Sequence, residues 1–112
     1  MRRAALALLT LLVAAQAAQA QRTYTCREAA ALKCAWIFSK TAAVLERADM
    51  ITVSDLETSL TVSARILQFH VGGSEREKLA AFAAVGARRD DAQTLGEFQR
   101  ESRSCLVMFP VE

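Results

Sequence analysis

Four copies of the capping-box pattern constrain the fold of this chain more than any other feature of its sequence. In a capping box, a Ser, Thr or Asp side chain accepts a hydrogen bond from the backbone three residues later, and a Glu or Gln at that position reaches back to the first residue. The pattern occurs at Thr25 with Glu28, Ser54 with Glu57, Ser74 with Glu77, and Asp90 with Gln93. Each copy marks a helix start, so the sequence predicts four helices.

The predicted helices cover residues 26–48, 55–71, 75–87 and 91–108. Gly72 and Gly73 end the second helix, and the single proline, Pro110, follows the fourth. Strand patterns are weak by comparison, and connections this short favour antiparallel neighbours. We therefore expect an all-α fold, a small up-down four-helix bundle.

The N-terminus has the three parts of a secretory signal peptide. Arg2 and Arg3 follow the initiating Met and form the basic part. Residues 4–15 are almost entirely apolar, and Ala18-Gln19-Ala20 has the small-residue pattern of a cleavage site. A second such pattern, Ala15-Gln16-Ala17, would place cleavage three residues earlier. The apolar run is too short to span a membrane, which takes about 20 residues. We expect a signal peptide at residues 1–20, and a single periplasmic or secreted domain at residues 21–112 without membrane attachment.

The charge balance of the mature domain argues against nucleic-acid binding. Removing Arg2 and Arg3 from the 14 lysines and arginines leaves 12, which balances the 12 aspartates and glutamates. Nucleic-acid binders gain most of their affinity from a basic excess gathered on one face. We therefore expect a protein partner or self-association, and no nucleic acid.

The three cysteines allow one internal disulfide in an oxidising compartment. Cys26 and Cys34 lie on the same predicted helix, where eight residues separate their Cα atoms by about 12 Å, and a disulfide needs Cα atoms within about 7 Å. The bridge must therefore join Cys105 to Cys34 or to Cys26. Cys34 and Cys105 both fall on core-facing stripes of their helices, which favours Cys34–Cys105 and leaves Cys26 free.

Residues 55–71 form the helix with the broadest apolar surface. Val62, Ile66 and Phe69 make a second apolar flank beside the first, so this helix either occupies the centre of the bundle or offers that flank to a partner. Of these alternatives we favour the central position.

Trp36 lies outside the main apolar stripe of the first helix, together with Leu32. A line of Lys33, Lys40 and Arg47 flanks it. An exposed Trp between long cationic side chains is typical of a binding anchor. The alternative is that a neighbouring helix, or the segment around Tyr24, covers Trp36.

Catalytic, metal and cofactor signatures are missing from the sequence. His70 is the single histidine, there is no Gly-x-Ser-x-Gly motif, and three dispersed cysteines do not make a zinc site. Haem ligation by His70 with Met50 or Met108 is conceivable, but the attachment motif Cys-x-x-Cys-His does not occur. We therefore expect no cofactor and no metal.

These features predict a non-enzymatic protein that acts as an interaction, inhibitor or immunity-like module. The partner-binding candidates are Leu32, Trp36, Val62, Ile66 and Phe69. One alternative is a carrier of a small ligand or haem in the bundle interior near His70. The other is a thiol-reactive protein that uses Cys26, which sits in the first turn of a helix beside Arg27, where thiols become more reactive.

Overall fold

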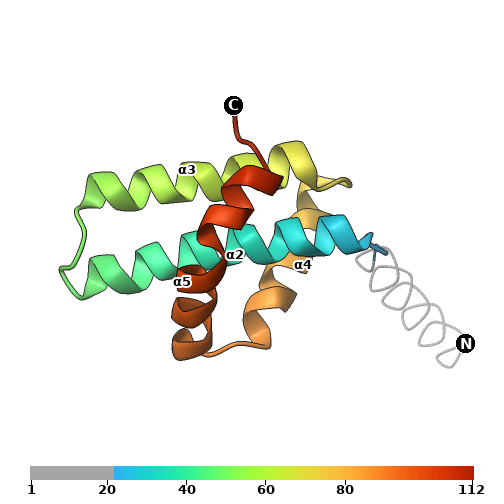
Figure 1. The fold of residues 1–112 in the computed structure, drawn as a ribbon. Coiled ribbons are helices and arrows are strands. Elements are labelled where there is room, and N and C mark those ends of the chain that lie inside the picture. The colour runs from blue at the N-terminus through green and yellow to red at the C-terminus, as the bar shows by residue number, and fades with distance from the viewer. Residues whose placement is uncertain (1–21) are drawn as a thin grey trace, which may run out of the picture.

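The computed structural model describes residues 22–112, and these fold into four α-helices with no strand among them. The helices are α2 (Cys26–Arg47), α3 (Val53–His70), α4 (Glu75–Ala87) and α5 (Asp91–Met108) (Figure 1). The predicted all-helical class is confirmed. The predicted signal peptide, residues 1–20, lies outside the described residues.

Every helix begins with a capping box, and three of these boxes are the predicted ones. The fourth was predicted at the wrong residues. In α3 the Thr52 hydroxyl accepts from the Asp55 N–H, and the Asp55 carboxylate accepts from the Thr52 N–H, both at 3.1 Å. The helix therefore starts two residues earlier than expected, because Asp55 performs the role that we assigned to Glu57.

The central element is α2, which packs against each of the other three helices. Our prediction that residues 55–71 form the central helix is therefore wrong. The physical reason lies in the small residues of α2. Ala31, Ala35 and Ala42 are all buried, and they let neighbouring backbones approach closely. At one such contact the Ser63 hydroxyl of α3 donates to the Ala35 carbonyl at 2.7 Å.

Only α2 and α3 lie side by side as an antiparallel pair, whereas α5 crosses α2 at a steep angle (Figure 1). The contacts of α5 still run antiparallel to α2. Arg27 donates to the Met108 carbonyl at 2.8 Å, and Lys40 lies 3.6 Å from Asp91. The four helices are thus arranged around α2, which differs from an up-down bundle in which each helix packs lengthwise against the next.

The end of α2 contains a residue in the left-handed conformation. Asp49 has φ of 55°, the one positive φ among the described non-glycine residues. The Met50 N–H donates to the Leu45 carbonyl and the Asp49 N–H to the Glu46 carbonyl. These two bonds form a Schellman motif, whose left-handed position is usually a glycine.

A disulfide joins Cys34 of α2 to Cys105 of α5, with the Cα atoms 5.7 Å apart. The structure thus contains the pairing that the core-facing stripes favoured. Ile37, Ile66 and Phe109 are completely buried around it, and Phe38 packs edge-on against Phe98. The covalent tie and the apolar core therefore hold the same pair of helices together.

Candidate functional site

A groove runs between α3 and α4, and α2 forms its floor. It consists of two adjoining depressions of about 370 and 350 Å³, which share Ala64 and Leu67 as lining residues. The apolar side chains along it are Trp36, Ala43, Leu60, Leu67, Leu79 and Phe82. We call this surface the α3–α4 groove. It exists because α3 and α4 each pack on α2 and diverge from Gly72-Gly73 instead of packing on each other.

Trp36 is the centre of the groove floor. Its half-buried indole meets the Phe82 ring edge-on, with 5.2 Å between ring centroids, and its Nε1–H points to the Thr94 hydroxyl at 3.4 Å. Gly86 lies directly beneath the same indole, where a Cβ would overlap the ring. A neighbouring helix therefore covers Trp36, as in one of the two alternatives above. Gly86, which we did not single out, is the sequence signal of this close approach.

The walls of the groove carry the apolar side chains that solvent reaches. Leu60 of α3 is 44% exposed, and Leu79 of α4 is 53% exposed. The α4 helix has no buried residue at all, so its apolar side chains are shared between α2 and the solvent. A concave apolar surface between two helices is the usual shape of a site for a partner's amphipathic helix.

The five partner-binding candidates predicted from the sequence lie in three different environments. Leu32 and Ile66 are buried in the core, so their prediction as partner-binding residues is wrong. Both lie at interfaces of α2, which three helices cover, whereas a helix of an up-down four-helix bundle packs against two neighbours. Val62 is half-buried against the core, and Trp36 contributes one face to the groove. Phe69 is exposed, at a separate site near the end of α5.

A charged network connects α2 to α5, and sequence reasoning did not find it. Lys33 Nζ lies 2.9 Å from Glu101 and 3.2 Å from Glu97, and Glu97 also accepts from Arg89 at 2.9 Å. The hydrogen bond to Glu101 raises the pKa of Lys33. Burial acts to raise the pKa of Glu97, but the bonds from Arg89 and Lys33 outweigh it and the pKa is lowered.

This network borders a shallow polar hollow of about 710 Å³ beside Gly96. Its charges pair with one another, which is the arrangement of a structural ion-pair network. The sequence signal was the i, i+4 pair Glu97 and Glu101, set opposite the Lys33 and Lys40 line.

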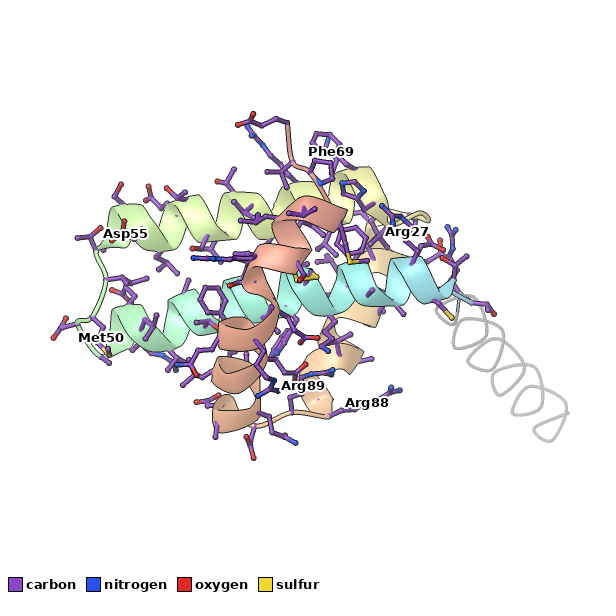
Figure 2. The ribbon with its side chains drawn as sticks, viewed as in Figure 1. Arg27, Met50, Asp55, Phe69, Arg88 and Arg89 are labelled. Atoms are coloured by element: carbon purple, nitrogen blue, oxygen red, sulfur yellow. A yellow bond between two sulfur atoms is a disulfide. The ribbon has the colours of Figure 1, made fainter. Side chains whose placement is uncertain are left out.

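The His70 side chain makes two contacts with the C-terminal segment. Its Nε2 lies 2.7 Å from the Pro110 carbonyl, and its ring packs edge-on against Phe109. Haem ligation by Nε2 would require this contact to break. Met50 follows α2 at the opposite end of α3 (Figure 2), about 26 Å of helix away, so it cannot be the second ligand. Met108 lies on the same end as His70 and is partly exposed.

Cys26 remains a free thiol and is exposed in the first turn of α2. The prediction that a Cys34–Cys105 bridge leaves Cys26 free is therefore confirmed. Within residues 22–112, no group of three or more His, Cys, Asp or Glu side chains is placed to hold a metal ion.

None of the four described helices combines the length and the apolar character that a membrane span requires. Comparisons with protein-family models, curated proteins and solved structures found no match.

Proposed function

We propose that this protein is exported, loses residues 1–20, and acts in the periplasm or outside the cell as a non-enzymatic protein-interaction module. The α3–α4 groove is its binding surface, and the occupant is an amphipathic helix of an exported protein partner. The observation that carries this proposal is the largely apolar lining of the depression around the Trp36–Phe82 pair. Gln68, Glu75 and Lys78 border the adjoining depression, where they can meet the polar face of an amphipathic helix.

The energetics favour an occupant with apolar side chains. Burying Leu60, Leu79 and the open face of Trp36 under a partner would contribute about 1–2 kcal/mol for each side chain, since all three are already partly covered. The backbones that carry Leu60 and Trp36 are fixed by the packing of α3 on α2, so little conformational entropy is lost there on binding. An inhibitor or immunity protein works in this way, by covering a surface that its target needs.

Export is supported by the disulfide, which persists in oxidising compartments. The mass and the N-terminal sequence of the mature protein test this part of the proposal. Cleavage after Ala20 leaves Gln21 as the first residue, and cleavage after Ala17 leaves Ala18. An intact Met1 in protein taken from its native compartment would contradict export.

A photo-crosslinking residue at position 60 tests the groove. The crosslinked partner is identified and purified, and its affinity is then measured for wild type, Leu60→Glu and Leu79→Glu. We expect each variant to weaken binding by about tenfold or more, because a charge is buried at the interface. Val53→Glu is the matched control, since Val53 is an exposed apolar residue of α3 outside the groove. Equal affinities for all four proteins would contradict the proposal.

A further inference from the structure

A second apolar surface lies where the C-terminal ends of α3 and α5 meet, away from the α3–α4 groove. Phe69 is 54% exposed, and three consecutive residues of α5 join it: Leu106 at 44%, Val107 at 82% and Met108 at 45%. Figure 2 shows Phe69 beside the end of α5, with Arg27 nearby. We call these four residues the C-terminal tip.

The contacts beneath the tip explain why its side chains face outward. Phe109 turns inward and is completely buried, and His70 and Arg27 hold it from two sides through its ring. Successive residues of a helix point 100° apart, so three exposed neighbours mean that much of the last turn of α5 faces solvent, between the buried Cys105 and Phe109. The tip therefore presents its apolar side chains outward in several directions, unlike the α3–α4 groove.

Arginines border the tip on all three helices that meet there. Arg27 donates to the Met108 carbonyl at 2.8 Å and is exposed. Arg65 lies one turn before Phe69 on α3, and Arg103 lies one turn before Val107 on α5; both are exposed. Side chains on a helix lean toward its N-terminus, so these guanidinium groups sit one level behind the apolar residues.

Few acidic residues lie near the tip along the chain. Residues 63–71 and 102–111 contain no Asp or Glu. Glu28, next to Arg27, pairs with Arg22 and accepts from the Gly72 N–H, and Glu112 follows the tip. The mature domain as a whole is neutral, so three arginines against Glu112 leave a local excess of positive charge at this end. Exposed apolar side chains with arginines one turn behind them are complementary to a surface that has negative charge on its outside and an apolar layer beneath.

Although the sequence predicted no membrane attachment, from this complementarity we propose that the C-terminal tip makes reversible, peripheral contact with an anionic lipid surface. Phe69, Leu106, Val107 and Met108 enter the boundary between headgroups and acyl chains, and the three arginines bind lipid phosphates. Acyl chains and headgroups can rearrange around apolar side chains that point outward in several directions, whereas a protein partner would need a surface shaped to match them. This contact is independent of the α3–α4 groove and would hold the groove near a membrane surface.

Sedimentation of the mature protein with vesicles tests the proposal. We expect binding to phosphatidylcholine vesicles that contain phosphatidylglycerol, and little binding to phosphatidylcholine alone. Added salt should weaken the binding, because it screens charges at the surface. Val107→Asp should weaken it by about tenfold, and Arg65→Gln and Arg103→Gln by about fivefold each.

Two controls separate this proposal from the groove. Val53→Asp and Arg88→Gln change an exposed apolar residue and an exposed arginine away from the tip (Figure 2), so both should bind vesicles as the wild type does. Leu60→Glu should lose the protein partner and keep the lipid. Circular dichroism establishes that each variant is folded. The proposal is overturned by equal binding to both kinds of vesicle, by no binding at low salt, or by a Val107-dependent contact with an acidic protein in place of lipid.

Discussion

Gly86 and Trp36 fit together so closely that a methyl group at position 86 would overlap the indole ring. This pair holds α4 against α2, and it therefore sets the width of the α3–α4 groove. Helix propensity alone would favour Ala over Gly within α4 by about 1 kcal/mol. Gly86 is thus a position where packing opposes local preference.

The substitution Gly86→Ala should therefore destabilise the protein in spite of its better helix propensity. Moving Trp36 or α4 aside costs about 1–3 kcal/mol of stability. Over most of that range the cost is larger than the gain of about 1 kcal/mol in helix propensity. Denaturant unfolding measures the loss, and Trp36 fluorescence reports the displacement directly, since it is the single tryptophan. Gly96→Ala on α5 is the control, because a Cβ there would approach only the flexible end of Arg100. A more stable Gly86→Ala protein would contradict this account of α4.

Loss of the Cys34–Cys105 disulfide should lower the free energy of unfolding by about 4 kcal/mol, the chain-entropy value for a loop of this length. The double variant Cys34→Ser with Cys105→Ser isolates the effect, and chemical denaturation measures it. Cys26→Ser should leave stability unchanged, since that thiol is exposed and free. A comparable loss in Cys26→Ser would mean that the stabilising bridge involves Cys26.

Asp49→Gly should stabilise the protein by about 1 kcal/mol, because glycine adopts the left-handed conformation without the steric cost that other residues bear. The Schellman hydrogen bonds from Asp49 and Met50 are backbone bonds and remain available. Asp49→Ala keeps the steric cost and should give no such gain. A melting temperature that rises equally for both variants would indicate a charge effect at this position instead.

Glu97 should make the free energy of unfolding depend on pH. Its folded pKa is lowered from the ordinary value of 4.5, so its stabilisation is fully present above that pH and is lost as the pH falls through the folded pKa. In Glu97→Gln the free energy of unfolding should be lower at neutral pH and should fall less steeply below about pH 4.5. Glu57→Gln, on an exposed site of α3, should follow the wild-type curve. Parallel curves for wild type and Glu97→Gln would show that the ion pairs do not stabilise the fold.

The helix starts could be predicted because capping is a local property. Thr25, Ser74 and Asp90 each find their partner three residues later, so no tertiary information is needed. The start of α3 was harder, because Thr52 with Asp55 and Ser54 with Glu57 both offer suitable side chains. Our criterion admitted only Glu or Gln at the third position, while the chain uses the shorter Asp55.

The central helix could not be identified from apolar patterning. The extra apolar flank of α3 indicated burial, and Ile66 is indeed buried, yet Phe69 of the same flank is exposed, as is Leu60 elsewhere on the helix. The alanines of α2 contribute little to a hydrophobic stripe, but they allow three helices to approach one backbone. Whether a Trp or Leu outside the main stripe is covered depends on that arrangement, which explains why Trp36 and Leu32 could not be placed in advance.

The dependence of α4 on a single neighbour has a consequence for its dynamics. Because α4 buries no residue and has its main helix contact with α2, we expect its amide hydrogens to exchange through local openings, while those of α2 exchange only when the whole domain unfolds. One wall of the groove is therefore the least stable of the four helices described in residues 22–112. The width of the groove can adjust to occupants of different bulk without disturbing the disulfide-linked α2 and α5.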